Sequence, residues 1–330
     1  MIYIVSKSNK PDYNIALEEY CFKNLLHQDK VFILWINEAS IIIGKHQNAF
    51  EEINADYVKE KGINVVRRIS GGGAVYHDLN NLNYTIISNE EKGDNFDFKT
   101  FSKPVIDTLS ELGVEAEFSG RNDILIDGKK ICGNAQAYIK GRIMHHGCLL
   151  FDVELSVLSK ALEIPKDIIN SSATKSVRSA VDNILPNLPN KISINEFSEK
   201  LLAHMKEKFP EMEEYVFSEK ELAEIEKIRV NKFGTWDWNW GKSPKFDIDR
   251  HSRYTAGKIQ VFANVKNSTI ENIKFYGTFF GNNSNLEEIE NALIGVKYIY
   301  KDVENALKKL KFNDYFAGFS LEELTKAIVD

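Results

Sequence analysis

The amino-acid sequence predicts an α+β fold rather than a doubly wound α/β fold. Segments with the periodicity of strands and of helices are interleaved along the 330 residues, but they show no regular strand–helix–strand rhythm. The chain is 43% hydrophobic, so it can bury a large core in more than one domain. The aromatic segment 233–240 gives way to a turn-like Gly-Lys-Ser-Pro, which predicts one domain over residues 1–245 and a small α+β domain over residues 246–330.

The N-terminal part is predicted to form a helix, several strands and a second helix. Apolar residues at helical spacing indicate that the first helix begins with Asp12 as its N-cap and buries Cys21 in the core. The second helix, over residues 99–112, is expected to end before Gly113. Between the two helices, strands are expected at residues 31–36, 40–44, 63–68, 73–77 and 82–88.

The middle of the chain is predicted to contain a β-hairpin. Asp127 and Gly128 form a strong turn signal between the expected strands, which are followed by a third one; the three cover residues 123–126, 130–139 and 142–153. A capping box, Ser193 with Glu196, predicts the start of a helix. That helix is expected over residues 194–208, and a charged helical segment is expected to end at Arg229. The C-terminal strands and helices are expected at residues 258–265, 270–276, 286–293, 301–310 and 321–329.

Composition excludes several classes of protein. A net charge of −6 at pH 7 argues against a general nucleic-acid binder. No segment approaches the run of about 20 apolar residues that a membrane helix requires, and the N-terminus carries no basic leader. We therefore expect a cytoplasmic protein without a membrane partner. The three cysteines form no Cys-x-x-Cys pair, which argues against a disulfide framework or a zinc ribbon.

The densest motif is the stretch 67–78, which reads Arg-Arg-Ile-Ser-Gly-Gly-Gly-Ala-Val-Tyr-His-Asp. It predicts an anion-binding loop, because a ligand can lie against the backbone N–H groups of the three glycines and Arg68 can pair with phosphate or carboxylate oxygens. The alternative is a flexible turn between two strands, and the flanking arginine pair favours the anion-binding loop. The motif lacks the Gly-Lys-Ser/Thr of a Walker loop, and it opens into a strand rather than the helix of a dinucleotide-binding fold.

A second group of polar residues lies around the predicted hairpin. Asn122 and Asp123 offer an amide and a carboxylate suited to a nucleotide or a hydrated Mg²⁺ ion, and Lys130 begins the return strand. Gly133 and Ala135 leave space beside that strand. The alternative interpretation is a solvated hairpin with surface lysines.

The third motif is His145-His146-Gly147-Cys148. Adjacent histidines on one strand point to opposite faces, which argues against a shared metal ion and places one of them toward a pocket or the sheet interior. Cys148 has the residue type of a nucleophile, but a small residue beside two leucines is more often packed in the core. We therefore prefer the packing interpretation.

These three motifs, in this order and spacing, resemble those of lipoate-protein ligases. The resemblance covers about the first 180 residues and includes Thr-Lys-Ser-Val-Arg-Ser at 174–179, and the part from Phe246 onward is similar to the small accessory domain of two-domain ligases. The resemblance implies a catalytic domain of the biotin and lipoate ligase superfamily, related to class II aminoacyl-tRNA synthetase cores. It also implies a mixed sheet folded around the site.

The resemblance implies an activity in two steps. The family activates lipoate with ATP to give lipoyl-AMP and pyrophosphate, and then transfers the lipoyl group to a lysine of an acceptor domain. The expected substrates are therefore lipoate and ATP, with Mg²⁺ as the metal ion. The expected partners are apo lipoyl domains, such as those of the E2 subunits of 2-oxoacid dehydrogenase complexes, and the glycine cleavage H protein.

The resemblance also implies roles for individual residues. Lys130 matches the family's essential lysine and is expected to bridge lipoyl carbonyl and phosphate oxygens, while Lys129 points the other way. Asp123 is expected to help bind Mg²⁺ or the adenosine. The other residues expected to bind lipoate or ATP are Arg68, Ser70, Gly72, Gly73, Ala74, Val75, Tyr76, His77, Asn83, Asn122, Gly133, Ala135 and His146.

Three other functions fit the sequence less well. A cysteine-dependent octanoyl or lipoyl transferase would place its nucleophile near residues 164–180, which contain no cysteine. A biotin-type ligase would use the same chemistry with a differently composed glycine motif, and the arginine pair with Ser70 fits lipoate better. A non-catalytic lipoate-binding protein would lack the reactive lysine, whereas Lys130 is present.

Overall fold

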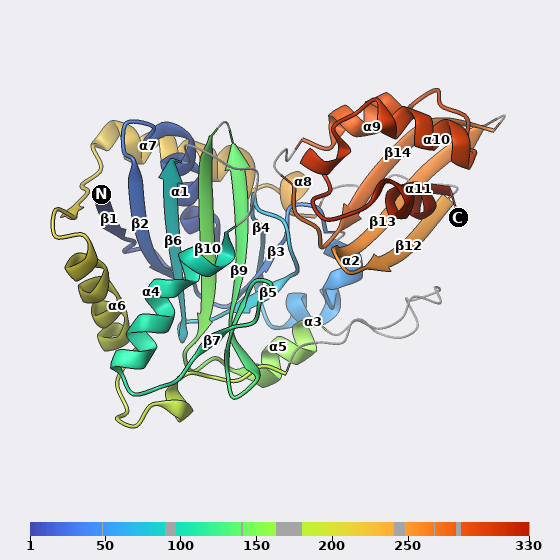
Figure 1. Ribbon diagram of the computed structural model, residues 1–330. Coiled ribbons are helices and arrows are strands. Elements are labelled where there is room, and N and C mark those ends of the chain that lie inside the picture. Colours follow the sequence, from blue (N-terminus) through green and yellow to red (C-terminus); the bar gives the residue numbers. More distant parts are fainter. Residues whose placement is uncertain are drawn as a thin grey trace.

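A computed structural model describes residues 1–47, 49–89, 97–139, 141–162, 180–240, 248–266, 268–281 and 285–329. Figure 1 shows a larger part built around one sheet and a smaller C-terminal part beside it. The predicted boundary between residues 245 and 246 and the Thr-Lys-Ser-Val-Arg-Ser segment at 174–179 lie outside the described residues. No helix in the described ranges is both long and apolar enough to cross a membrane.

The main sheet has eight strands in the order β11-β1-β2-β6-β10-β9-β8-β7. Strand β1 pairs in parallel with both of its neighbours, and the other neighbouring strands pair antiparallel, so the sheet is mixed as expected. The predicted hairpin and the strand after it are confirmed as β8, β9 and β10. The bounds are β1 Ile2–Val5, β2 Lys30–Ile36, β6 Asn81–Asn89, β7 Glu117–Phe118, β8 Asp123–Ile126, β9 Lys129–Ile139, β10 Arg142–Leu150 and β11 Glu213–Glu214.

Helices cover both faces of this sheet. In β2, Val31, Ile33 and Trp35 join the core on one face, while Phe32 and Leu34 join the core on the other. Helices α1 and α7 pack on the first face and α4 and α6 on the second (Figure 1). Their bounds are α1 Pro11–Asn24, α4 Phe98–Glu111, α6 Ile194–Lys208 and α7 Glu219–Ile228. The short helices after β10 and α7 are α5 Leu155–Ala161, η2 Leu185–Asn187, η3 Arg229–Phe233 and α8 Trp236–Asn239.

Two predictions about helix starts had different outcomes. The capping box at Ser193 is confirmed, since its side chain accepts from the backbone of Glu196 and the Glu196 side chain accepts from the backbone of Ser193. The N-cap assigned to Asp12 is wrong, because α1 begins at Pro11, whose fixed φ suits the first helical position. Asp12 lies in the first turn and pairs with Arg229 at 2.7 Å. Cys21 is in the core, as predicted.

A second, smaller sheet holds the loop that the sequence analysis singled out. Strand β3 Ser40–Ile43 lies between β4 Asn64–Arg67, which is parallel to it, and β5 Val75–His77, which is antiparallel. Residues 68–74 connect β4 to β5, and we call them the glycine loop. The short helices α2 Ala49–Glu52 and α3 Ala55–Glu60 follow β3 in sequence.

The C-terminal part is a three-stranded antiparallel sheet with helices packed on it. Its elements are β12 Ile248–Tyr254, β13 Gly257–Lys266, β14 Thr269–Gly277, α9 Glu287–Leu293, α10 Tyr300–Lys308, η4 Phe312–Asp314 and α11 Leu321–Val329. The sequence analysis missed β12, because five polar residues in a row interrupt any apolar alternation in this edge strand. The other predicted strands and helices of this part are confirmed.

The two parts meet at the loop that follows β3. The ring of His46 stacks on Phe279 with ring centroids 5.0 Å apart, and the His46 carbonyl accepts a hydrogen bond from the backbone N–H of Gly277. Lys258 pairs with Glu52 at 3.1 Å. The smaller part therefore lies directly against the segment that neighbours the glycine loop.

Candidate active site

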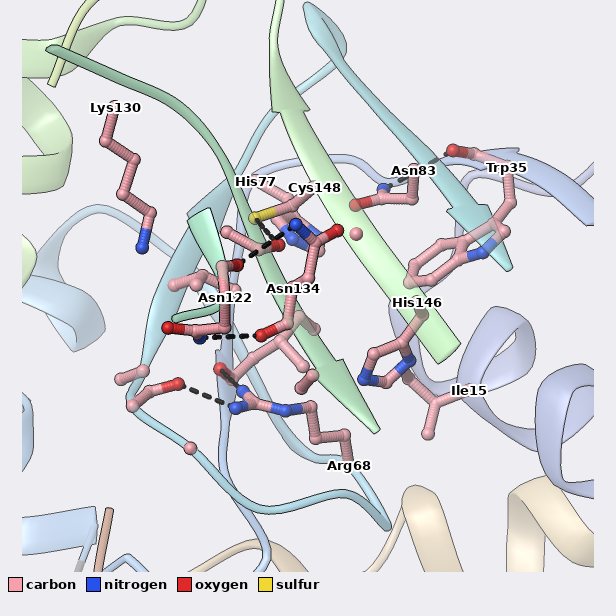
Figure 2. Close-up of a pocket in the computed structure, with 18 residues that line it drawn as sticks. Ile15, Trp35, Arg68, His77, Asn83, Asn122, Lys130, Asn134, His146 and Cys148 are labelled. Atoms are coloured by element: carbon pink, nitrogen blue, oxygen red, sulfur yellow. Dashed lines mark hydrogen bonds between the residues drawn. The ribbon is translucent and has the colours of Figure 1, made fainter. Parts of the chain in front are cut away.

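A pocket lies between the main sheet, the small sheet and the glycine loop (Figure 2). Most of the residues predicted to bind a substrate line it: Arg68, Gly72, Gly73, Ala74, Val75, His77, Asn83, Asn122, Lys130, Gly133, Ala135 and His146. The lining also includes residues that the sequence analysis did not select: Ile15, Trp35, Ile42, Asn134, Gly147 and Cys148. The pocket thus joins an apolar region to one with a cation, amides and exposed backbone.

Three predicted residues lie behind the pocket wall rather than in it. Ser70 is a buried residue of the glycine loop, and its hydroxyl lies 2.7 Å from Nε2 of His146. The side chain of Tyr76 points into a core on the opposite side of β5. Asp123 lies next to the pocket and pairs with Lys130.

Arg68 shapes the glycine loop from inside. Its guanidinium donates to Oγ of Ser70 at 3.0 Å, to the carbonyl of Ile42 at 3.0 Å, and to the carbonyls of Gly71 and Gly73 at 2.6 and 2.8 Å. Burial lowers the pKa of Arg68 to about 10, which leaves it charged at neutral pH. The loop carbonyls therefore point toward a buried cation, and this arrangement fixes the direction of the backbone N–H groups.

Arg67 makes different contacts from Arg68. Its guanidinium donates only to backbone carbonyls among the described contacts, and these belong to Gly44, Lys45, Gln47, Trp238 and Asn239. The side chain thereby ties β4 to the segment after β3 and to α8. Of the arginine pair, Arg68 faces the pocket and Arg67 stabilises the fold.

The glycine loop is held in a conformation that a side chain would disturb. Gly72 has a φ of +90°, in the region that favours glycine. A Cβ atom at Gly44 would lie 2.0 Å from the carbonyl oxygen of Gly72, so the two segments touch through their backbones. A Cβ at Gly71 would lie 2.2 Å from the carbonyl oxygen of Phe279 in the C-terminal part.

The two lysines of the hairpin point to opposite sides, as the alternation along a strand predicts. Lys130 lines the pocket, and its Nζ lies 2.8 Å from Oδ1 of Asp123. A Cβ at Gly133 would lie 2.8 Å from the same Nζ, so this glycine leaves room for the ammonium group. Lys129 is 53% exposed and pairs with Asp182 at 2.9 Å on the outside.

Asn134 holds the start of β8 against the pocket. Its side chain donates to the carbonyl of Asn122 at 3.0 Å, and the Asn122 amide donates to the carbonyl of Asn134 at 2.8 Å. Its Oδ1 accepts from the hydroxyl of Tyr84 at 2.7 Å. A Cβ at Gly147, on the neighbouring strand, would lie 2.3 Å from this Oδ1, so the glycine is needed for the contact.

The two adjacent histidines face opposite sides of β10, as predicted. His145 is buried beside Gln136 and stacks on Phe101 with ring centroids 5.2 Å apart. His146 lines the pocket, and its Nδ1 lies 2.9 Å from a carboxylate oxygen of Glu18.

His77 presents an uncharged N–H group at the pocket wall. The side-chain oxygen of Asn37 accepts from Asn14 at 2.9 Å, so the Asn37 amide nitrogen donates to Nδ1 of His77 at 3.2 Å. Burial, with Arg68 and His146 nearby, lowers the pKa of His77 to about 3. The neutral ring therefore carries its hydrogen on Nε2, which has no hydrogen-bond partner among the described residues.

The three cysteines do not provide an activated thiol. All three are buried, and Cys148 lines the pocket with its Sγ 3.5 Å from the carbonyl oxygen of Gly133. Burial raises the pKa of each thiol above its usual value. Because the thiolate is the nucleophile, these thiols are poorly suited to carry an acyl group at neutral pH.

The chain matches two family models. The lipoyl protein ligase A/B catalytic domain matches residues 10–206, and the bacterial lipoate protein ligase C-terminus matches residues 243–328. The glycine loop and the hairpin lysine thus lie within the part of the chain that matches a lipoyl protein ligase catalytic domain.

Related sequences agree with these matches over the whole chain. The chain is 44% identical to the lipoate-protein ligase LplJ of Bacillus subtilis, over 99% of this chain and 100% of that one. It is 39% identical to lipoate–protein ligase 1 of Staphylococcus aureus, over 96% of each chain. The chain belongs to the lipoate-protein ligase family.

Solved structures extend the likeness to three dimensions. The structure of P. falciparum LipL1 in complex with lipoate matches with a TM-score of 0.84 and 28% identity, over 99% of each chain. A lipoate-protein ligase A bound with ATP matches with a TM-score of 0.63 and 29% identity, over 73% of this chain and 98% of that one. A bi-partite ligase from Thermoplasma acidophilum, described with its E2 lipoyl domain, gives 0.64 and 29% over 75% and 98%.

Sequence reasoning missed the apolar lining because nothing local marks it. Trp35 and Ile15 lie in segments with the pattern of ordinary core residues, and only the tertiary fold places them on a cavity. Asn134 did carry a signal, since an amide in the middle of a strand of small and apolar residues needs buried partners.

Proposed function

We propose that this protein activates free lipoate with ATP to form lipoyl-AMP and pyrophosphate, and then transfers the lipoyl group to a lysine of a lipoyl domain. The observation that carries the proposal is that the pocket lining combines an apolar region with a polar, cationic one. Ile15, Trp35 and Ile42 offer an apolar surface for an aliphatic chain, while Lys130 and the glycine loop offer a cation and backbone N–H groups for carboxyl and phosphate oxygens. Membership of the ligase family supports this assignment of the two regions.

The first step joins two anions. A carboxylate oxygen attacks the α-phosphorus of ATP, and pyrophosphate leaves with the electrons of the broken P–O bond. In this proposal Asp123 orients Lys130, and the ammonium group of Lys130 offsets the charge on the carboxyl and phosphate oxygens as they approach. The N–H groups of the glycine loop are already oriented by Arg68, so they need little reorganisation.

The second step forms the amide bond. A neutral amine of the acceptor lysine attacks the lipoyl carbonyl, loses a proton and displaces AMP. A cation that touches both the carbonyl oxygen and the phosphate stabilises the oxyanion and the leaving group together. We assign both contacts to Lys130, because the guanidinium of Arg68 already donates to carbonyls of the glycine loop.

We propose that Mg²⁺ enters this site with the phosphates of ATP. Among the described residues there is no group of three His, Cys, Asp or Glu side chains that could hold a metal ion. Mg²⁺ is commonly bound through phosphates, waters and one or two carboxylates, and Asp123 is the carboxylate beside Lys130. Asp123 would then contribute at most one ligand.

Asp123→Asn tests this residue. The substitution removes the charged partner of Lys130 with little change of shape, and it is expected to slow lipoyl-AMP formation roughly 10- to 100-fold, the typical effect of losing one charged hydrogen bond. Pyrophosphate release should be measured while Mg²⁺ is titrated, and a raised KM for Mg²⁺ is expected if Asp123 is also a ligand. Asp182→Asn, which breaks the matched pair with Lys129, is the control. Equal losses in the two variants would contradict a role for Asp123.

A variant without cysteine separates this ligase from a thioester-forming transferase. If AMP carries the acyl group, no enzyme thiol is needed, so a protein with Cys21, Cys132 and Cys148 replaced by alanine should still modify the acceptor. Reduced thermal stability is expected, because all three positions are buried. Acceptor mass should be followed by mass spectrometry with and without ATP. Transfer from free lipoate without ATP would contradict the proposal, as would a folded variant that forms lipoyl-AMP and cannot pass it on.

The acceptors we propose are lipoyl domains of E2 subunits and the glycine cleavage H protein. The test is to incubate purified protein with ATP, Mg²⁺, lipoate and one apo acceptor, and to measure pyrophosphate release and the gain in acceptor mass. Pyrophosphate release without acceptor modification would support the formation of lipoyl-AMP but would reject the chosen acceptor. The cytoplasmic location stays a prediction from the sequence.

A further inference from the structure

Glu18 is a buried carboxylate behind the pocket that the proposed function has not used. It lies in α1 with 1% of its surface exposed, and it is absent from the pocket lining. Its Oε1 atom accepts a hydrogen bond from the hydroxyl of Thr85 at 2.5 Å and lies 2.9 Å from Nδ1 of His146. One oxygen atom therefore contacts two strands of the main sheet.

The contact with His146 continues to the glycine loop. Nε2 of His146 lies 2.7 Å from Oγ of Ser70, which accepts from Nε of Arg68 at 3.0 Å. A guanidinium only donates and a carboxylate only accepts, so these two groups fix the direction of the chain. Nδ1 of His146 donates to Glu18, and Ser70 donates its hydrogen to Nε2 when that nitrogen carries no hydrogen of its own.

The contact with Thr85 continues to the apolar side of the pocket. Nε1 of Trp35 donates to Oγ1 of Thr85 at 3.0 Å, which leaves the threonine hydrogen for Glu18. The indole of Trp35 lines the pocket. The orientation of this ring is therefore set by the same carboxylate oxygen.

We propose that Glu18 is a positioning residue that fixes the two ends of the pocket relative to each other. Through His146 and Ser70 it fixes Arg68, which sets the carbonyls of the glycine loop, and through Thr85 it fixes Trp35. The inference rests on the proposed function for its kinetic consequences, since the two ends would hold phosphate and acyl chain. Glu18 itself touches neither.

The test begins with a signature that does not depend on activity. Nitrogen-15 NMR of the histidine side chains should show His146 in the Nδ1–H form in the wild-type protein. Glu18→Gln keeps the shape and removes the charge, so His146 is expected to shift toward a mixture of tautomers. Glu19→Gln is the matched control, because Glu19 is the next residue of the same helix, is also buried, and pairs with Lys23 and Lys232. It should leave the His146 signal unchanged.

Kinetics then separate the two hydrogen-bonded connections of Glu18, which we call its arms. One arm runs through His146 and Ser70 to Arg68, and the other runs through Thr85 to Trp35. Glu18→Gln is expected to lower the rate of lipoyl-AMP formation about tenfold, as for a weakened charged hydrogen bond, and to raise the KM for lipoate. Thr85→Val cuts only the arm to Trp35, so it should raise the KM for lipoate and leave the His146 tautomer as it is. Ser70→Ala cuts the other arm and should lower kcat with a nearly unchanged KM for lipoate. Adding Ser70→Ala to Glu18→Gln should lower kcat little further, because both act on one chain.

Two results would overturn the proposal: an Nε2–H form of His146 in the wild-type protein, or equal effects of Glu18→Gln and Glu19→Gln. If Glu18→Gln does not fold, Ser70→Ala and Thr85→Val still test the two arms, and identical kinetic changes in both would refute the separation. A wild-type protein that forms no lipoyl-AMP would reject the proposed function. The tautomer of His146 would then still decide whether Glu18 positions this histidine.

Discussion

Replacing Lys130 with alanine is expected to slow lipoyl-AMP formation by a factor on the order of 10²–10³, the usual cost of removing one donor that acts on developing charge. Lys130 is the lysine of the pocket lining, and Gly133 leaves space for its ammonium group beside Asp123. The loss should appear in kcat, because the contact strengthens as the carboxylate approaches phosphorus. Single-turnover pyrophosphate release measures it directly.

Lys129→Ala is the matched control for this prediction. It removes the same charge one residue away, but Lys129 pairs with Asp182 on the outer side of the hairpin. Its loss should leave the rate of lipoyl-AMP formation nearly unchanged, because an exposed ion pair contributes little. Similar losses in both variants would contradict the assignment of opposite sides to the two lysines.

Replacing Gly72 with valine is the second large effect that we expect. A Cβ at this position would lie 3.0 Å from Nη2 of Arg68, and the backbone has a φ of +90° that a branched residue rarely adopts. The loop must shift, and a displacement of about 1 Å in a binding site can cost roughly 10²-fold. Calorimetric titration with lipoyl-AMP should therefore show affinity weakened by about that factor. If this variant bound lipoyl-AMP with wild-type affinity, the result would contradict the assignment of the glycine loop to the binding site.

Gly62→Val is a control that separates the effect of backbone strain from the effect of a substitution inside the binding site. Gly62 also has a positive φ, of +63°, but a Cβ there would meet no heavy atom of the described part of the chain within 4 Å. Both variants should lose stability through backbone strain, typically 1–3 kcal/mol. Only Gly72→Val should lose affinity for lipoyl-AMP, and a loss in both would indicate a general loosening of the fold.

Local patterns predicted much of this fold, since strands, turns and caps depend on neighbours in sequence. The hairpin at Asp127 and Gly128 and the capping box at Ser193 are examples, and both turn residues have positive φ as such turns require. The opposite directions of the two hairpin lysines and of the two histidines also followed from strand alternation. These features needed no knowledge of the tertiary structure.

What the sequence could not indicate depends on contacts across the fold. Glu18 and Glu19 are adjacent and identical in type, yet one contacts His146 at the pocket and the other pairs with Lys232. Likewise, the sequence analysis selected Arg68 from the arginine pair, but only the tertiary structure shows that Arg67 holds carbonyls of distant segments. In each pair, partners far away in sequence decide the role.

The three consecutive glycines carry unequal constraints for anyone who redesigns this pocket. At Gly71 a methyl group would collide with the backbone of Phe279, so a change there must be accommodated by the C-terminal part as well. At Gly72 the backbone conformation itself restricts the choice of residue. At Gly73 a Cβ would meet only the methyl group of Thr278 among the described residues, at 4.0 Å, so these residues leave the position open. Libraries that vary acyl or nucleotide preference should therefore start at Gly73.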